Sequence, residues 1–162
     1  MKATYRITES DYVNAMKLFT NPSPKLLKIC LIVAIVLILL LIFAQNIIKG
    51  IALFLLIYGV LVVLVKRYIV VPIISRRHYK KYKLIHEEFM IELLDEGVRL
   101  ISPNGDGRLT WDKILKWRQN KIYILLYPMP RLYYIIPKSI EASGFDVSLL
   151  ISRLTQHVGK SI

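Results

Sequence analysis

The chain has 162 residues, 55% of them hydrophobic, and carries a formal net charge of +12 at pH 7. This length allows one modest domain beside any membrane segment, and the mean hydropathy of +0.48 is typical of a membrane protein. The charge by itself suits a nucleic-acid-binding protein, but it is concentrated in residues 22–86, which contain Lys and Arg and no Asp or Glu. These cations flank apolar runs. We therefore interpret them as a membrane-topology signal and expect no nucleic-acid partner.

The first 24 residues are expected to form a strand and a helix. Alternation of apolar and polar residues predicts a strand over Ala3–Thr8. An apolar stripe then predicts a short amphipathic helix over Asp11–Phe19, with Thr8 as its capping residue. The proline-containing segment Asn21–Pro24 ends this helix.

Two long apolar runs follow, Ile29–Ile48 and Ile51–Val65, with Lys49-Gly50 between them. A membrane-crossing helix needs about 20 apolar residues, and the second run reaches this length if Lys66 and Arg67 extend their side chains to the headgroups. A buried helix pair in a soluble protein would show a polar face, which these runs lack. A cleaved signal peptide would have a shorter apolar core nearer the N-terminus. Residues 25–74 are therefore predicted to form a two-helix transmembrane hairpin.

The basic residues set the expected orientation. The turn between the two runs holds Lys49, whereas all the other Lys and Arg residues of 22–86 lie on the outer flanks. The positive-inside rule places both termini in the cytoplasm. Residues 75–86 are expected to be a basic juxtamembrane linker that attracts anionic lipid headgroups. The anionic-lipid candidates are Lys66, Arg67, Arg76, Arg77, Lys80 and Lys81.

Residues 87–162 have the pattern of five or six antiparallel strands followed by one helix. Asp95–Gly97 predicts a turn between two strands. Pro103–Gly107 predicts a second turn, in which Asn-Gly and Asp-Gly supply positive φ angles. The mixed period of Arg108–Asn120 predicts a strand with a kink near Asp112. Further strands are predicted at 121–127 and 131–136, and helical spacing of apolar residues predicts a C-terminal helix from Val147 to Val158.

The segment Lys121–Tyr127 is apolar on both faces, so neither face is suited to solvent. The second face is expected to pack on the N-terminal helix, on another membrane component or on a partner protein. Aromatic and arginine residues are typical interface anchors. About half of the aromatic residues on these strands are needed for the core. The partner-binding candidates are Trp111, Trp117, Arg118, Tyr127, Tyr133 and Tyr134.

The order of these parts resembles the YcxB-like family of small bacterial membrane proteins. The resemblance rests on the opening Tyr5–Tyr12, the two apolar runs, Leu109–Ile114 with its Trp-Asp-x-Ile sequence, and Tyr134–Lys138 with Ile-Ile-Pro-Lys. It covers nearly the whole chain. It implies a membrane α+β protein of the bacterial inner membrane, in which a pleckstrin-homology-like antiparallel sheet capped by a C-terminal helix lies in the cytoplasm. The domains are then expected at 1–24, 25–74, 75–86 and 87–162. The family implies no catalytic residues.

The sequence shows no constellation for catalysis or metal binding. The histidines at 78, 86 and 157 lack metal-ligand spacing, and no Gly-rich phosphate loop or HExxH is present. Asn104–Gly107 lacks the further carboxylates of an EF-hand loop. Cys30 has no second cysteine to pair with. We expect no metal, no cofactor and no enzymatic activity.

The function expected from the sequence is therefore binding. A membrane-tethered cytoplasmic module would bind a protein partner, anionic lipid headgroups or both. One alternative is an immunity protein that neutralises a membrane-acting toxin, and a lower-ranked one is a lipid-modifying enzyme. Gly59 permits close helix approach, which leaves a homo-oligomer open.

Overall fold

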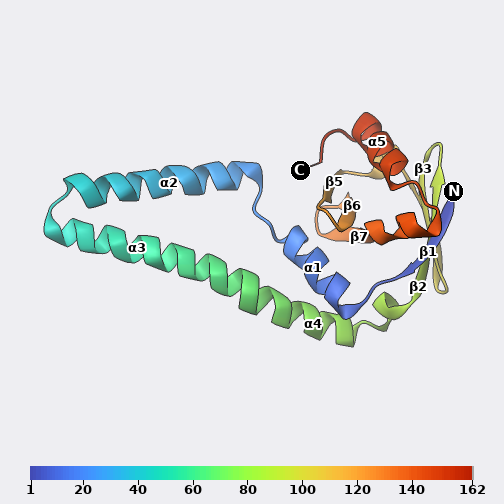
Figure 1. The fold of residues 1–162 in the computed structure, drawn as a ribbon, viewed down its shortest axis with the longest axis horizontal. Helices are drawn as coiled ribbons and strands as arrows, with labels where there is room; N and C mark the ends of the chain where they lie inside the picture. The colour runs from blue at the N-terminus through green and yellow to red at the C-terminus, as the bar shows by residue number, and fades with distance from the viewer. Residues whose placement is uncertain (162) are drawn as a thin grey trace. The chain divides into compact units, whose positions relative to one another are not determined.

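A computed structural model describes residues 1–161 (Figure 1). They form two compact units, and one is inserted into the other. The sheet unit combines residues 1–19 with the chain from Ile74 onward, and the helical unit comprises Thr20–Ile73. Of the region 1–24 that was expected to be separate, residues 1–19 thus belong to the same unit as the C-terminal half, and residues 20–24 belong to the helical unit.

The helical unit contains two long helices that pack side by side, α2 (Pro24–Phe43) and α3 (Asn46–Val65) (Figure 1). The Ser23 hydroxyl caps α2 by accepting a hydrogen bond from the Leu26 N–H. Helical structure continues beyond α3 through a π-helical turn, Lys66–Val70, into α4 (Val71–Lys81).

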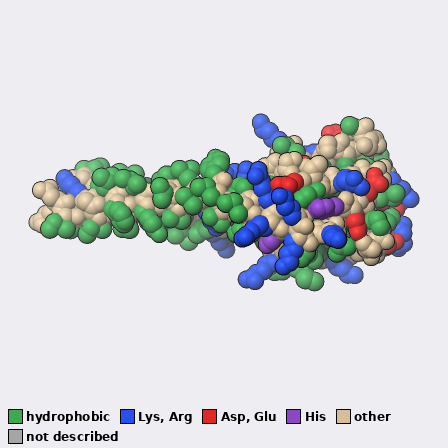
Figure 2. Space-filling model, turned by 90° about the horizontal axis from the view of Figure 1, so that it is seen from below, with side chains coloured by type: hydrophobic (Ala, Val, Ile, Leu, Met, Phe, Trp, Pro, Cys, Tyr) green, Lys and Arg blue, Asp and Glu red, His purple; other side chains and the backbone are tan. Residues whose placement is uncertain are grey.

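Both helices are long and apolar enough to cross a membrane. Each has 20 residues, which corresponds to about 30 Å of helix. In α2 no residue is buried, and in α3 only Ala52 is. Their apolar side chains point outward along the helices (Figure 2), an arrangement that suits lipid better than water. These lengths and exposures support the membrane part of the predicted fold class.

Residues 75–86 are mostly helical, although a linker was expected there. α4 continues to Lys81, and a 3₁₀ helix spans Lys83–His86. The linker was predicted from the basic residues of this segment, which do not by themselves indicate a helix. The sequence did not show that Ser75, which is fully buried, gives α4 an inward face.

The sheet unit contains two antiparallel sheets. The first has the order β1-β2-β3-β4 and the second the order β5-β6-β7. The strands are β1 (Lys2–Arg6), β2 (Glu88–Leu94), β3 (Gly97–Ser102), β4 (Gly105–Thr110), β5 (Lys116–Gln119), β6 (Tyr123–Met129) and β7 (Leu132–Pro137).

The first strand pairs with β2 although the whole helical unit lies between them in the sequence. The register places Ala3 opposite Ile91 and Tyr5 opposite Phe89. The predicted N-terminal strand is confirmed, and the pairing makes it the edge of the first sheet.

The predicted kink near Asp112 is a 3₁₀ turn, Trp111–Lys113, that carries the chain from one sheet to the other. The Trp111 N–H donates to the Glu96 carbonyl at 3.0 Å, and its indole donates to the Asp95 carbonyl at 2.8 Å. These bonds fix the turn against the β2–β3 connection.

The turn between β3 and β4 differs from its prediction. Among the described residues only Gly144 and Gly159 have positive φ, so neither Gly105 nor Gly107 supplies it. Ser102 pairs with Gly105, which leaves Pro103 as the first central residue of a two-residue turn. Proline fixes φ near −65°, so the mirror-image turns that need positive φ at this position are impossible.

The main core lies between the two sheets and α5 (Val147–His157), the predicted C-terminal helix. The Asp146 side chain caps α5 by accepting from the Leu149 N–H at 2.8 Å. The core contains Ile91, Val98, Trp117, Ile124, Leu126, Ile136, Leu150 and Leu154.

A second core lies on the other face of β6, where α1 (Glu9–Phe19) packs. Tyr123, Leu125 and Tyr127 of β6 belong to this cluster together with Ala15 and Leu18 of α1. Of the three covers expected for the doubly apolar strand, the structure thus shows the N-terminal helix.

Candidate functional site

The first turn of α1 is held by a capping network. Thr8 Oγ1 accepts from the Asp11 N–H at 3.1 Å, while Asp11 Oδ2 accepts from the Thr8 N–H at 2.9 Å. The other Asp11 oxygen accepts from the Tyr123 hydroxyl of β6 at 2.6 Å. Burial opposes ionisation, but the hydrogen bonds from Thr8 and Tyr123 outweigh it and lower the pKa of Asp11. The same burial and bond raise the pKa of Tyr123 to about 12.

From Ile74 onward α4 is part of the sheet unit, where Ser75 and Tyr79 form its inward face. The Tyr79 hydroxyl donates to the Ile7 carbonyl at 2.9 Å, and its ring stacks on His86 with centroids 4.2 Å apart. The ring of Tyr12 of α1 lies beside the Tyr79 ring, with 6.1 Å between their centroids. These contacts fix one face of α4 and leave the opposite face outside.

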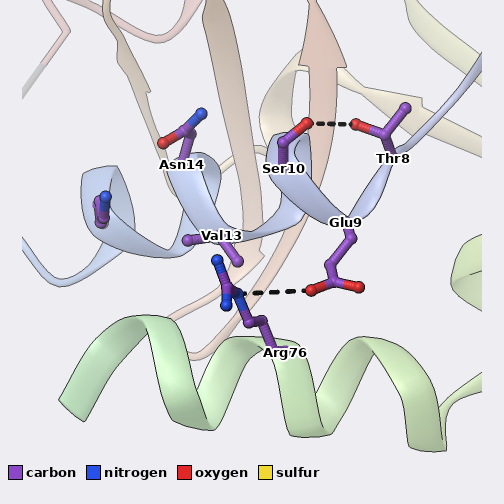
Figure 3. Close-up of a pocket in the computed structure, with 7 residues that line it drawn as sticks. Thr8, Glu9, Ser10, Val13, Asn14 and Arg76 are labelled. Atoms are coloured by element: carbon purple, nitrogen blue, oxygen red, sulfur yellow. Dashed lines mark hydrogen bonds and ion pairs between the residues drawn. The ribbon is translucent and has the colours of Figure 1, made fainter. Parts of the chain in front are cut away.

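A groove of about 520 Å³ lies between α1 and α4 (Figure 3). On the α1 side it presents hydroxyls, an amide, an ammonium group and the Glu9 carboxylate, and on the α4 side a guanidinium. Glu9 and Arg76 bridge it, with 3.4 Å between Oε1 and Nε. The lining residues are Thr8, Glu9, Ser10, Val13, Asn14, Lys17 and Arg76. The hydroxyls, the amide and the Lys17 and Arg76 cations can hydrogen-bond or charge-pair with an anionic oxygen ligand, which would compete with Glu9 for Arg76.

The six anionic-lipid candidates are all exposed. Arg76 lines the groove, while Arg77, Lys80 and Lys81 stand on the outer side of α4. Basic side chains gather over this helix in Figure 2. Lys66 and Arg67 belong to the helical unit, where the Arg67 guanidinium donates to the Asn21 side-chain oxygen at 2.7 Å.

Of the aromatic partner-binding candidates, both tryptophans lie in the main core. Trp111 stacks on His157 at 5.5 Å between centroids, and the Trp117 indole donates to the Gly159 carbonyl at 2.7 Å. Both rings therefore have structural roles.

Arg118, Tyr127 and Tyr133 belong to the contact between the second sheet and α1. The Arg118 guanidinium donates to the carbonyls of Leu18 and Phe19, at 3.1 and 3.2 Å. Tyr127 and Tyr133 stack with Phe19. Burial raises the pKa of both tyrosines.

Tyr134 is the exposed member of the six, with 37% of its surface accessible. It lines a small groove of about 260 Å³ together with Phe89, Leu100 and residues at the end of β3 and the start of β4. Binding of a protein partner at the aromatic cluster stays a prediction that depends on this residue.

We call the groove between α1 and α4 the basic groove, after Lys17 and Arg76 in its lining. Sequence reasoning did not identify its α1 side. It recognised Thr8 and Asp11 as a helix start, but Glu9, Asn14 and Lys17 gave no signal of their own. They become a site only because α4 packs opposite them, some 60 residues later in the chain. Within residues 1–161, no three His, Cys, Asp or Glu side chains gather as metal ligands.

Two helices long and apolar enough to cross a membrane, joined to two antiparallel sheets, give this chain an α+β architecture. Residues 93–152 match the model of the YcxB-like protein family, which confirms the expected family resemblance over this part of the chain. The match runs from the end of β2 into α5, so the basic groove and the helical unit lie outside it. Comparison with the curated proteins and with the solved structures gives no match.

Proposed function

We propose that this protein is a bacterial inner-membrane anchor whose sheet unit binds anionic phospholipid headgroups through α4 and the adjoining groove. In this proposal α2 and α3 form a transmembrane hairpin, and both termini are cytoplasmic. The inter-helix link carries Lys49, whereas the cations flanking the helices, from Lys25 and Lys28 on one side to Lys83 on the other, are on the cytoplasmic side.

A pleckstrin-homology-like fold is part of the proposal. Its support is the order of the elements: a four-stranded sheet, a three-stranded sheet and one C-terminal helix that covers the core. The helical unit enters this arrangement as an insertion between β1 and β2.

The single observation that carries the headgroup proposal is the exposed cationic face of α4. Arg77, Lys80 and Lys81 point away from the face that Ser75 and Tyr79 bury. The helix is the last part of the continuous helical segment Asn46–Lys81, whose apolar part is long enough to cross a membrane. A cation near an anionic membrane surface contributes about 1 kcal/mol of attraction. Three such cations therefore suffice to hold the helix at an anionic surface while leaving the contact sensitive to salt.

The proposal can be tested with a fluorescent reporter beside α4. Leu84, which is 60% exposed, is replaced by cysteine in a Cys30→Ala background and labelled with an environment-sensitive dye. The full-length protein is placed in phosphatidylcholine nanodiscs with or without phosphatidylglycerol. We expect a blue shift of the emission only with phosphatidylglycerol, a smaller shift at high salt, and no shift in the triple variant Arg77→Gln, Lys80→Gln, Lys81→Gln.

The matched control removes three exposed cations elsewhere in the sheet unit: Lys113→Gln, Lys121→Gln, Arg131→Gln. It changes the net charge equally and should keep the shift. An equal loss of the shift in both triple variants, or the same emission in both lipid mixtures, would contradict headgroup binding by α4.

A further inference from the structure

A second groove lies between α2 and α3, wholly within the helical unit. It has a volume of about 430 Å³ and an apolar lining. Small side chains make room for it, because Cys30 and Ala34 lie on one wall and Gly59 on the other. A Cβ built on Gly59 would meet no atom within 4 Å, so the space beside it is open. The other lining residues are Ile29, Val33, Leu37, Leu55, Leu56, Val60, Val63 and Leu64.

Cations lie at one end of this groove. Lys28 directly precedes the first lining residue of α2, and Lys66 and Arg67 follow the last lining residue of α3 within one turn. Lys25 lies one turn further toward the start of α2. The hydrogen bond from Arg67 to Asn21 joins the chain segments at this same end. The other end, at the link between the helices, holds Lys49.

We propose that this groove is a binding site for one anionic diacyl phospholipid. One acyl chain lies in the groove between Ala34 and Gly59, and the cations at the groove end bind the phosphate. This assignment rests on the proposed insertion of α2 and α3 into the membrane. It differs from headgroup binding at α4 because it needs the apolar groove as well as charge, and because it uses different cations.

The charges favour a lipid over a second copy of the chain. Two copies packed in the same orientation through this groove would bring two sets of the four cations to the same end, in a low-dielectric surrounding that strengthens their repulsion. A phospholipid brings an apolar chain that suits the groove lining and a negative phosphate that suits the cations at its end. Charge complementarity thus selects the occupant.

Native mass spectrometry of the full-length protein in mild detergent tests the site. Phosphatidylglycerol or phosphatidylcholine is added at equal concentration, and the protein is activated until weakly bound lipid leaves. We expect one phosphatidylglycerol molecule to remain on the monomer and phosphatidylcholine to be lost. Lys28→Gln and Lys66→Gln should each reduce retention about fivefold, the change expected for one surface cation, whereas Lys49→Gln should not.

The groove is tested by Gly59→Leu, which fills the open space and should abolish retention. The matched control is Gly50→Leu in the same helix, where a Cβ also meets no atom within 4 Å and the groove is not involved. Circular dichroism and gel filtration check that each variant keeps its helices and its monomeric size.

Equal retention of both lipids, or equal effects of the two glycine variants, would overturn the proposal. A lipid-free dimer that Gly59→Leu dissociates would overturn it in favour of a second copy. If the dye beside α4 shows no emission shift, the mass-spectrometry test of the groove still stands, because its variants change none of the α4 cations. A chain that stays soluble without detergent would refute the proposed membrane insertion, and this site with it.

Discussion

Asp11 links the start of α1 to the second sheet through a single carboxylate. Its two oxygens accept from the Thr8 backbone and hydroxyl and from the Tyr123 hydroxyl, at distances of 2.6–2.9 Å. Only the ionised form accepts all of these bonds, which is why they lower the pKa despite the opposing effect of burial. The stabilisation from this group is therefore present above the pKa of the unfolded chain, and it is lost as the pH falls through the lower folded pKa.

We predict that Asp11→Asn lowers the free energy of unfolding at neutral pH by about 1.5–3 kcal/mol, the range for hydrogen bonds to a charged group. The difference from the wild type should begin to shrink as the pH falls below about 4, the ordinary Asp pKa, and be smallest below the lowered pKa of the folded carboxyl. Urea unfolding followed by fluorescence of Trp111 and Trp117, both buried in the sheet unit, measures this. The exposed Glu141→Gln is the control. An Asp11→Asn deficit of the same size at pH 3 and pH 7 would refute the linkage.

At the scale of the elements, Arg118 connects β5 with the end of α1. Its guanidinium donates to the carbonyls of Leu18 and Phe19, two of the helix-end acceptors that have no partner inside the helix. The positive charge also lies at the negative end of the helix dipole. This buried side chain therefore holds α1 on the sheet.

We predict that Arg118→Met lowers the free energy of unfolding by about 2–4 kcal/mol, because the helix-end carbonyls become buried without donors. Amide hydrogen exchange should rise in α1 before it rises in α5, since the contact that is lost belongs to α1 alone. Arg131→Met, at an exposed position of the β6–β7 turn, is the matched control. Uniform acceleration of exchange over both helices would show that Arg118 supports the whole unit rather than α1.

The elements could be predicted from the sequence because their signals are local. Apolar length predicted α2 and α3, the Thr8–Asp11 pattern predicted the start of α1, and the apolar character of 121–127 predicted a strand covered on both faces. Which element covers each face is decided by contacts between distant residues. Trp117 is a residue type expected at interfaces, yet its ring is buried and its indole donates to the Gly159 carbonyl.

Of the candidate site formed by α1 and α4, only the α4 half could be predicted from the sequence. The cations of α4 are visible in the sequence as a charge run, and the structure leaves them exposed. The groove beside them requires α1 to lie opposite Arg76, and no local pattern encodes that packing. The same limit applies to the lipid groove, whose open space depends on how Cys30 and Ala34 align with Gly59.

At the scale of the whole molecule, the insertion of the helical unit makes the sheet unit discontinuous. Residues 1–19 supply the edge strand β1 and the helix that covers the second face of β6. Tyr123, Leu125 and Tyr127 are each at most 2% exposed in that contact. Burying a large apolar side chain contributes about 1.5–3 kcal/mol. Three of them thus amount to a large part of the 5–15 kcal/mol that stabilises a typical domain.

We therefore predict opposite results from two deletions. Replacing Thr20–Ile73 by a flexible Gly/Ser linker should give a soluble, folded sheet unit, because its two cores and its strand pairing use no residue of the helical unit. Removing residues 1–19 as well should leave a chain that unfolds or aggregates, since the second face of β6 and the edge of β2 become exposed. Cooperative thermal unfolding and dispersed amide spectra would identify the folded form. A well-folded protein lacking residues 1–19 would show that the sheets and α5 suffice, and that α1 is an accessory helix rather than part of the core.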